Sequence, residues 1–190
     1  GFDALLGALK TGKIDMVISG MSPTPERLKE VAFSQPYMNV QQRVIVRKED
    51  KDKFHSTKDF EGVRAGAQKQ TTQEELIKTE LTGAVPTSLQ KIPDLIMNLK
   101  NNKLDAVVME EPVGEAYVSQ NEDLAFADVT FEKGSKDTAV AFPKDAPVLT
   151  EKVNASIKQI NDQKLMDGYK KEANQLMFQK DQSFLQKYGK

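Results

Sequence analysis

The sequence of 190 residues contains no cysteine, no tryptophan and a single histidine, His55. The lack of cysteine excludes disulfides, thiolate chemistry and cysteine-type zinc sites. One histidine makes a poor metal site or general base, so we interpret His55 as a surface residue. A Gly-rich phosphate loop and a nucleophile elbow are also missing. The sequence therefore predicts neither a cofactor nor a metal.

An excess of charge of one sign and long hydrophobic runs are missing too. The 27 lysines and arginines balance 28 aspartates and glutamates along the chain, which argues against nucleic acid as a partner. No apolar run reaches the roughly 18 residues that span a membrane. Gly1 to Asp3 have the character of a helix interior, with neither an initiating methionine nor a signal peptide ahead of them. We expect that an N-terminal part of the natural protein precedes them.

One helix–turn–strand unit occurs twice in the chain. Residues 9–17 read LKTGKIDMV and residues 99–107 read LKNNKLDAV. Each unit leads from an amphipathic helix through a short polar turn into an apolar strand. The first strand ends on small residues before an arginine, and the second ends on acidic residues. Because ligands of open α/β sheets bind beyond the carboxyl ends of strands, we predict two lobes that face one small zwitterion.

Strand and helix patterns alternate along the whole sequence, with a charged loop at 49–53. We expect strands at 14–18, 42–48, 63–67, 85–86, 106–109, 124–129 and 138–142, and helices beginning near residues 2, 24, 74, 92, 115, 147 and 165, the last extending to about 188. This alternation is typical of an α/β fold with parallel strands. Hinges near 39–42 and 137–139 would let the chain cross twice between lobes. We expect residues 1–40 and 138–190 in a discontinuous first lobe and residues 41–137 in the second.

Arg27 is the leading candidate for binding a carboxylate. Its planar guanidinium can form two parallel hydrogen bonds to one. Ser22 precedes it in a strand-to-helix turn, where free amide groups favour an anion, and Gly20 would let the backbone approach a ligand closely. The alternative is a solvated arginine in the first turn of a helix. The small-residue loop after a buried strand favours the binding role.

Glu110 is the matching candidate for an ammonium group. It follows the apolar strand of the second unit, at the position that corresponds to Gly20 in the first. The alternative is a solvated acidic pair of Glu110 and Glu111 ahead of Pro112. Because the repeat aims both strand ends at one cleft, we favour a binding role for Glu110.

Three polar residues, Thr71, Thr72 and Gln73, follow the predicted strand at 63–67. Their side chains can cap the helix that begins near Glu74. They can also reach a ligand across the cleft. We expect at least one of them to be the cap, and Thr72 and Gln73 to face the ligand.

Three segments resemble motifs of one protein family. They read SGMSPTPERLKEVAFSQPY from Ser19, GAQKQTTQEEL from Gly66 and LDAVVMEEPVGEAYV from Leu104. In order and spacing they resemble the polar amino-acid-binding proteins of ABC importers, over most of the chain. The resemblance implies a two-lobed α/β periplasmic-binding fold of type II, each lobe a mostly parallel sheet flanked by helices. The first lobe would be incomplete, because the family begins with a strand–helix–strand segment that has no counterpart here.

The resemblance also implies which residues bind the main chain of the amino acid. Ser22 and Arg27 would bind the α-carboxylate, with help from the backbone of Gly20 or Met21. Glu110 stands where the family usually has aspartate and would bind the α-ammonium group. Its additional methylene group would change the size of the pocket.

The second lobe would supply further contacts. Thr72, with Gln73 beside it, would contact the main chain of the ligand. Ser19 of the first lobe would contact the ligand's side chain, and Gln68 would line the pocket from the second lobe. Gln70 replaces the glycine that is usual before the paired threonines, so the turn there could differ from that of the family.

We therefore predict a non-enzymatic, extracytoplasmic binding protein that captures a free polar amino acid and delivers it to an ABC permease. Ser19 and Glu110 favour a basic amino acid, arginine or lysine, with glutamine next. Membrane association would come through the permease or an N-terminal lipid anchor. Two alternatives stay open: a cyclohexadienyl-dehydratase-like enzyme in which Glu110 acts as an acid, and the ligand-sensing domain of a receptor.

Overall fold

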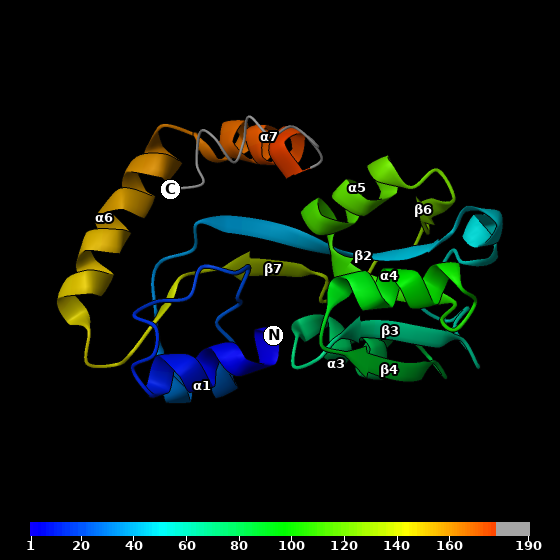
Figure 1. Ribbon diagram of the computed structural model, residues 1–190, viewed down its shortest axis with the longest axis horizontal. Coiled ribbons are helices and arrows are strands. Elements are labelled where there is room, and N and C mark those ends of the chain that lie inside the picture. The colour runs from blue at the N-terminus through cyan, green and yellow to red at the C-terminus, as the bar shows by residue number, and fades with distance from the viewer. Residues whose placement is uncertain (178–190) are drawn as a thin grey trace.

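The computed structural model describes residues 1–177, which form two groups of elements (Figure 1). The larger group contains a six-stranded sheet, and its strands are β2 Met38–Arg47, β3 Arg64–Gln68, β4 Val85–Leu89, β5 Ala106–Glu110, β6 Leu124–Phe126 and β7 Ser135–Thr138. The strand order is β4-β3-β5-β2-β6, with β7 paired to β2. β3 pairs in parallel with β4 and β5, and β2 is antiparallel to β5, β6 and β7. Within this sheet β2 therefore runs against the other strands.

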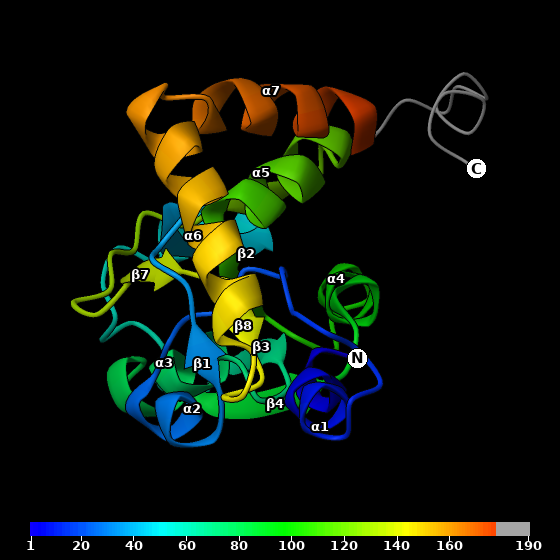
Figure 2. The ribbon, with the colours of Figure 1, turned by 90° about the vertical axis from the view of Figure 1, so that its left-hand side faces the viewer.

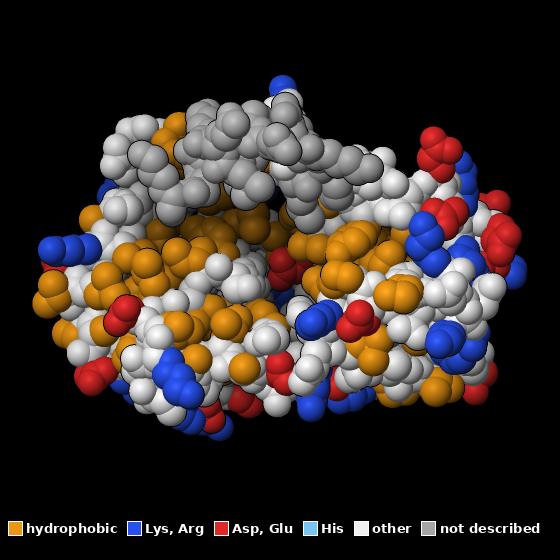
Figure 3. Space-filling model, in the orientation of Figure 1, with side chains coloured by type: hydrophobic (Ala, Val, Ile, Leu, Met, Phe, Trp, Pro, Cys, Tyr) orange, Lys and Arg blue, Asp and Glu red, His pale blue; other side chains and the backbone are white. Residues whose placement is uncertain are grey.

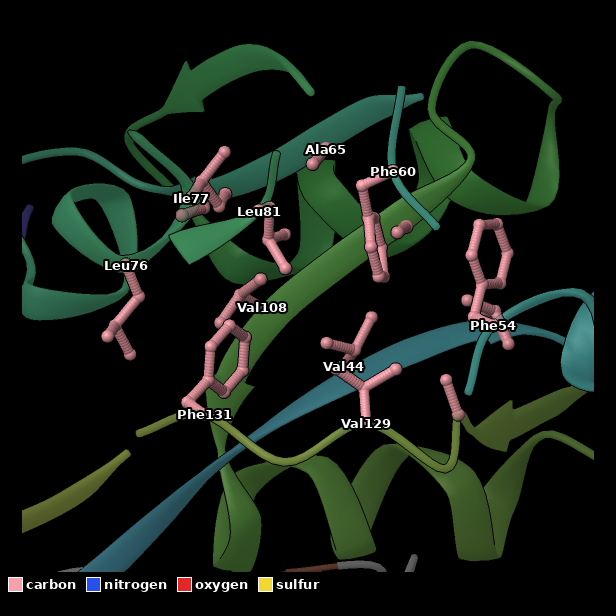
Figure 4. Close-up of a cluster of buried hydrophobic side chains, with 14 residues drawn as sticks. Val44, Phe54, Phe60, Ala65, Leu76, Ile77, Leu81, Val108, Val129 and Phe131 are labelled. Atoms are coloured by element: carbon pink, nitrogen blue, oxygen red, sulfur yellow. The ribbon is translucent and has the colours of Figure 1, made fainter. Parts of the chain in front are cut away.

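Helices cover both faces of the larger sheet, namely α3 Thr72–Glu80, α4 Ile92–Lys100 and α5 Glu111–Gln120. Alternate residues of β2 and β5 enter different cores, as the two-residue period of a strand requires. Val44 and Val108 pack with α3 and with phenylalanine side chains (Figure 4). Ile45 and Val107 pack with the leucines of α4 on the opposite face. These two cores hold the carboxyl ends of β3 and β5, where α3 and α5 begin.

The smaller group is built around a two-stranded antiparallel sheet. It contains η1 Phe2–Ala4, α1 Leu5–Lys10, α2 Pro25–Glu30, β1 Ala32–Phe33, β8 Ala141–Phe142 and α6 Pro147–Asp162. α6 runs across this sheet (Figure 2) and packs Ile157 against Phe142. Thr24 is the N-cap of α2, because its side chain accepts a hydrogen bond from the Arg27 amide at 3.3 Å. The predicted start of this helix is confirmed, and it places Arg27 in the first turn.

Two segments connect the groups and lie side by side. Residues 38–41 of β2 pair with β7, from Met38 opposite Thr138 to Gln41 opposite Ser135. The hinges predicted near 39–42 and 137–139 fall on this pair. The lobe boundaries at 40 and 138 stay a prediction. After α6, α7 Met166–Met177 contacts α5, and the predicted continuation to residue 188 lies outside the described residues.

The predicted strand at 14–18 is wrong. In this segment only Val17 forms an isolated bridge, to Ala141, whereas Met16 and Ile18 are 40% and 60% exposed. A strand needs continuous hydrogen bonding to a neighbour, and among the described residues this segment has one bridging partner. The smaller sheet is antiparallel, so the expectation of a mostly parallel sheet is wrong there. In the larger sheet it holds for strand direction, although β2 makes antiparallel pairs with β5, β6 and β7.

Other boundaries also differ from the prediction. The charged loop at 49–53 is part of a 3-10 helix, η2 Lys48–Lys53, and β2 begins four residues before the predicted 42. The predicted strand at 138–142 is divided between β7 and β8. The reason is a change of partner, because the Ala139 amide donates to the Met21 carbonyl at 2.9 Å and leaves the larger sheet.

Candidate functional site

A cavity of about 310 Å³ lies between the two groups, at the carboxyl ends of β3 and β5. The space-filling view shows one face of the molecule hollowed, with hydrophobic side chains on both sides of the hollow (Figure 3). Eight residues predicted from the sequence line the cavity, namely Ser19, Gly20, Ser22, Arg27, Gln68, Thr72, Gln73 and Glu110. The fold thus brings together residues as far apart in the sequence as Ser19 and Glu110.

Met21 is the predicted site residue that does not line this cavity. Its side chain is buried in the core of the smaller group, and its carbonyl oxygen accepts the hydrogen bond from Ala139. Met21 lines instead a neighbouring cavity of about 740 Å³, which Arg27 and Thr72 also line.

Gly20 and Glu110 touch across the cavity. The backbone of Gly20 has φ of +62°, a conformation that glycine adopts without steric cost. A Cβ atom at Gly20 would lie 2.8 Å from Oε2 of Glu110, and the Gly20 amide donates to the Tyr37 hydroxyl at 3.1 Å. Glycine at this position is therefore what lets the carboxylate of Glu110 approach the loop of the smaller group.

Arg27 reaches from α2 to the larger group. Its Nη1 donates to the Ser22 carbonyl at 2.9 Å and its Nη2 to the Gln70 carbonyl at 3.0 Å. The guanidinium lies 5.4 Å from the centre of the Phe2 ring, and burial lowers the pKa of Arg27. No carboxylate of the described residues forms an ion pair with it. A half-buried positive charge held by neutral carbonyls is available to an anion.

Glu110 carries the opposite charge at the end of β5. Burial raises the pKa of its carboxyl to about 7, because a low-dielectric surrounding disfavours the ionised form. Its neighbour Glu111 instead pairs with Arg43 at 2.7 Å. The structure thus separates the two carboxylates that the sequence left paired, and it turns Glu110 toward the cavity.

In the turn before α3, the expectation that one polar residue caps the helix is confirmed, whereas the ligand-facing roles of Thr72 and Gln73 stay a prediction. Thr71 is the helix cap, since its hydroxyl accepts from the Glu74 amide at 3.4 Å and donates to the Gln68 carbonyl at 2.6 Å. Gln70 has φ of +61°, so it adopts the backbone conformation that a glycine would favour there. The Gln68 side chain donates from Nε2 to the Gln90 carbonyl at 2.9 Å, which leaves its Oε1 as an acceptor.

Gln42 is a buried polar residue behind the cavity lining, and the sequence analysis gave it no role at the site. Its Oε1 accepts from Nε2 of Gln73 at 2.7 Å. A signal was present, since Gln42 is in phase with Val44 and Val46, two strand residues of the buried face. The apolar part of the cavity lining, to which Phe2, Ile92 and Leu95 contribute, was also not anticipated.

The cavity can hold a small ligand that carries both charges. Arg27 and Glu110 are the charged residues of its lining, and the rest is polar or apolar. Residues 1–177 contain no group of three or more histidine, aspartate or glutamate side chains that could hold a metal ion. Among the described helices, none combines the length and apolar character needed to cross a membrane.

The sequence profile of the bacterial extracellular solute-binding proteins, family 3, matches residues 1–174. The chain belongs to this family. The family resemblance noted in the sequence is thereby confirmed, and the family is an extracellular one.

Two curated relatives and one solved structure show what this family member is similar to. It is 35% identical over 174 residues to the arginine-binding extracellular protein ArtP of Bacillus subtilis. The aligned residues cover 90% of this chain and 67% of ArtP. It is 35% identical over 123 residues to a probable histidine-binding protein of Campylobacter jejuni, covering 65% of this chain and 47% of that protein. The structure is that of the ABC transporter substrate-binding protein AbpA from Streptococcus pneumoniae bound to L-arginine, with 38% identity and a TM-score of 0.88 over 92% of this chain and 73% of that chain.

The comparisons confirm the predicted type II periplasmic-binding fold, with its mixed α/β sheet and flanking helices. The two curated relatives are named as amino-acid-binding proteins, and the solved structure is that of an amino-acid ABC transporter substrate-binding protein. The prediction that this family member is not an enzyme is therefore confirmed, and the dehydratase-like alternative is wrong. The chain spans between 47% and 73% of the lengths of these three proteins.

Proposed function

We propose that this chain captures one free L-amino acid in the cavity between its two groups of elements. One observation supports this most: Arg27 and Glu110 line the same cavity from opposite groups, and neither forms an ion pair with the other described residues. A free amino acid supplies a carboxylate for the first and an ammonium group for the second. The volume of about 310 Å³ is at the lower end of the roughly 300–1,000 Å³ of small-molecule pockets.

The main chain of the amino acid would be held at two ends. Arg27 would bind the α-carboxylate with the Ser22 hydroxyl and the backbone N–H of Met21, since the Gly20 N–H is bonded to Tyr37, and Glu110 would bind the α-ammonium group. Thr72 would contact the same main chain from the first turn of α3. Charge-assisted hydrogen bonds of this kind are stronger than neutral ones, so they would supply most of the shared affinity for amino acids.

The ligand's side chain would be basic, arginine or lysine, with glutamine next. Gln68 supports this, because its Nε2 is bonded to Gln90 and its remaining polar atom is an acceptor. Ser19 adds a hydroxyl group on the opposite side of the cavity. Donor-rich groups such as guanidinium, ammonium or a primary amide complement these acceptors. The similarity to proteins named for arginine and histidine binding also supports a basic ligand.

Ligand binding would favour a closed arrangement of two lobes, residues 1–40 with 138–190 and residues 41–137. The hydrogen bond from Arg27 to the Gln70 carbonyl joins the two groups directly. An amino acid that contacts both groups binds the closed arrangement more tightly than the open one, and this difference drives the shift. The closed form would dock on an ABC permease outside the cytoplasm, with membrane association through the permease or an N-terminal lipid anchor.

Calorimetric titration with a panel of L-amino acids tests this function. Arginine, lysine, histidine, glutamine and alanine separate basic, amide and apolar side chains. We expect arginine or lysine to bind best, and Arg27→Ala to weaken binding by at least 100-fold, since an arginine–carboxylate pair is lost. The matched control is Lys29→Ala, an exposed cation of the same helix. Near-normal affinity of Arg27→Ala, or equal losses in both variants, would refute the carboxylate assignment.

A further inference from the structure

Gln42 is a fully buried amide with an unused donor. The residue is 2% exposed, and its Oε1 accepts the 2.7 Å hydrogen bond from Gln73. Its Nε2 is shielded from solvent and has no hydrogen-bond partner among the described residues. Buried polar groups in proteins are nearly always hydrogen-bonded, so an unpaired donor next to a binding cavity calls for an explanation.

The strand register places Gln42 beside Glu110. The two residues are directly opposite each other in the antiparallel pair of β2 and β5. The backbone N–H of Gln42 points away from β5 and donates to the Gly134 carbonyl at 2.9 Å. Gln42 and Glu110 are therefore a non-hydrogen-bonded pair of the two strands. In such pairs the two side chains are at their closest, with Cβ atoms roughly 4.5–5.5 Å apart. The side-chain amide of Gln42 is therefore within reach of the Glu110 carboxyl group.

Both side chains are on the α3 face of the sheet. Gln42 is in phase with Val44 along β2 and Glu110 with Val108 along β5, and these valines belong to the core under α3. Gln73, in the first turn of α3, holds the oxygen of the Gln42 amide. With its oxygen held by α3, the amide of Gln42 has its nitrogen free for Glu110.

The other charged groups near Glu110 have different roles. Arg27 faces the cavity from α2, and Arg43 of β2 is paired with Glu111 and lies 4.7 Å from the Phe126 ring centre. Burial is the one cause that shifts the titration of Glu110. The ionised form of Glu110 thus lacks a donor until a neighbour supplies one.

We propose that Gln42 is a positioning residue for ligand binding, whose Nε2 donates to the Glu110 carboxylate when that group ionises to hold the ammonium group of the ligand. The proposal rests on the proposed function for its biological meaning. The chain of hydrogen bonds from Gln73 through Gln42 to Glu110 orients the carboxylate toward the cavity. It also links the start of α3 to the end of β5, so both binding elements of the larger group are set together.

The consequence is a specific pH signature. A hydrogen bond to the ionised carboxylate favours that form, so removal of Gln42 Nε2 makes ionisation of Glu110 harder. Gln42→Met keeps the volume and removes the donor. The matched control is Gln41→Met, because Gln41 is the preceding residue of β2, is exposed, and points to the opposite face.

Carbon-13 NMR of the Glu110 carboxyl group tests this contact in protein without ligand, with Glu110→Gln identifying the resonance. We expect the titration midpoint of Glu110 to rise by about one pH unit in Gln42→Met and to stay unchanged in Gln41→Met. An unchanged midpoint in Gln42→Met overturns the proposal. If Gln42→Met does not fold, Gln42→Glu is the second variant, since it keeps an acceptor for Gln73. It should raise the titration midpoint of Glu110 by more than about one unit, and an unchanged midpoint in this variant also overturns the proposal.

Calorimetric titration with L-arginine gives an independent result. With a midpoint about one unit higher, the affinity of Gln42→Met should be about fivefold weaker than wild type at pH 7, about tenfold weaker at pH 6 and equal at pH 9. A loss that is uniform from pH 6 to pH 9 indicates a merely structural role and overturns the proposal. If the wild-type chain binds no amino acid, the proposed function fails, whereas the NMR titration still decides whether Gln42 contacts Glu110.

Discussion

Affinity for an amino acid should fall steeply as the pH is lowered from 8 to 5. The cause is Glu110, whose carboxyl group has a pKa of about 7 where its ordinary value is 4.5. Only the ionised carboxylate can hold the ammonium group of the ligand, so binding must remove the proton wherever the free protein carries it. With a pKa of about 7, the group is about 90% ionised at pH 8 and about 1% ionised at pH 5.

These fractions give the magnitude. The apparent affinity should be about 90-fold weaker at pH 5 than at pH 8, which is about 2.7 kcal/mol in binding free energy. Binding at pH 6 should release about 0.9 proton per ligand, because about nine in ten Glu110 groups are protonated there before binding. Arg27 stays charged throughout this range, so the carboxylate end of the ligand contributes no slope.

Calorimetry in buffers of different ionisation enthalpy measures both the affinity and the released protons. Glu110→Gln is the control, since its amide cannot ionise. It should bind weakly at every pH and release no proton. Equal wild-type affinities at pH 5 and pH 8, or a wild-type enthalpy that does not depend on the buffer at pH 6, would refute the assignment of Glu110 to the ammonium group.

The same pKa predicts a stability effect in the absence of ligand. The folded pKa of Glu110 is above its unfolded value, so the folded state binds more protons between pH 4.5 and about 7. The contribution of Glu110 to the free energy of unfolding is therefore greatest below pH 4.5, and about 3 kcal/mol of it is lost as the pH rises to about 7. Chemical denaturation of wild type and Glu110→Gln over this range should show the difference.

Two further predictions concern the loop at the cavity and a structural ion pair. Gly20→Ala should weaken ligand binding by at least about tenfold and lower the free energy of unfolding by about 1–2 kcal/mol, because its Cβ would strike Glu110. Gly12→Ala, also at positive φ but with open space around it, should lower only the free energy of unfolding. Calorimetry measures binding and urea denaturation measures stability, and equal binding losses in the two variants would contradict the contact. Arg64 lowers the pKa of Asp105 to about 2. Because solvent screens this pair, Asp105→Asn should remove about 1 kcal/mol of the stability that wild type has above pH 4 and loses as the pH falls through 2. Acid titration of the unfolding free energy checks this, and parallel curves for the two proteins would contradict it.

Local rules accounted for elements of both groups. In the smaller group, the N-cap residue Thr24 and Pro25 at the first helical position define the start of α2, and the structure agrees. The buried strand at 106–109 and the helix before it follow from apolar periodicity alone, since both are covered on their apolar faces. The same rules misjudged 14–18, because an apolar run becomes a strand only where a neighbouring backbone supplies its hydrogen bonds.

The site shows the same division. The sequence motifs identified Arg27 and Glu110, and the fold places both on one cavity. Whether Glu110 or its neighbour Glu111 faces that cavity depends on Arg43. This strand residue lies 68 positions before Glu111 and donates a hydrogen bond to its carboxylate. The burial of Gln42 could have been read from its phase with Val44 and Val46, but its position opposite Glu110 could not, because strand register is set by tertiary pairing.

By itself, the sequence determined the family, the alternation of helices and strands, and the charged residues that suit a zwitterion. These properties depend on residue types and on spacings of a few positions, which the chain carries with it. The tertiary structure alone decided that Met21 is buried away from the cavity, that Arg27 is bonded to carbonyls of both groups, and that Gln42 is opposite Glu110. Burial and hydrogen-bond partners are properties of packed surfaces, and they set the charge state of Glu110 through contacts that no local pattern encodes.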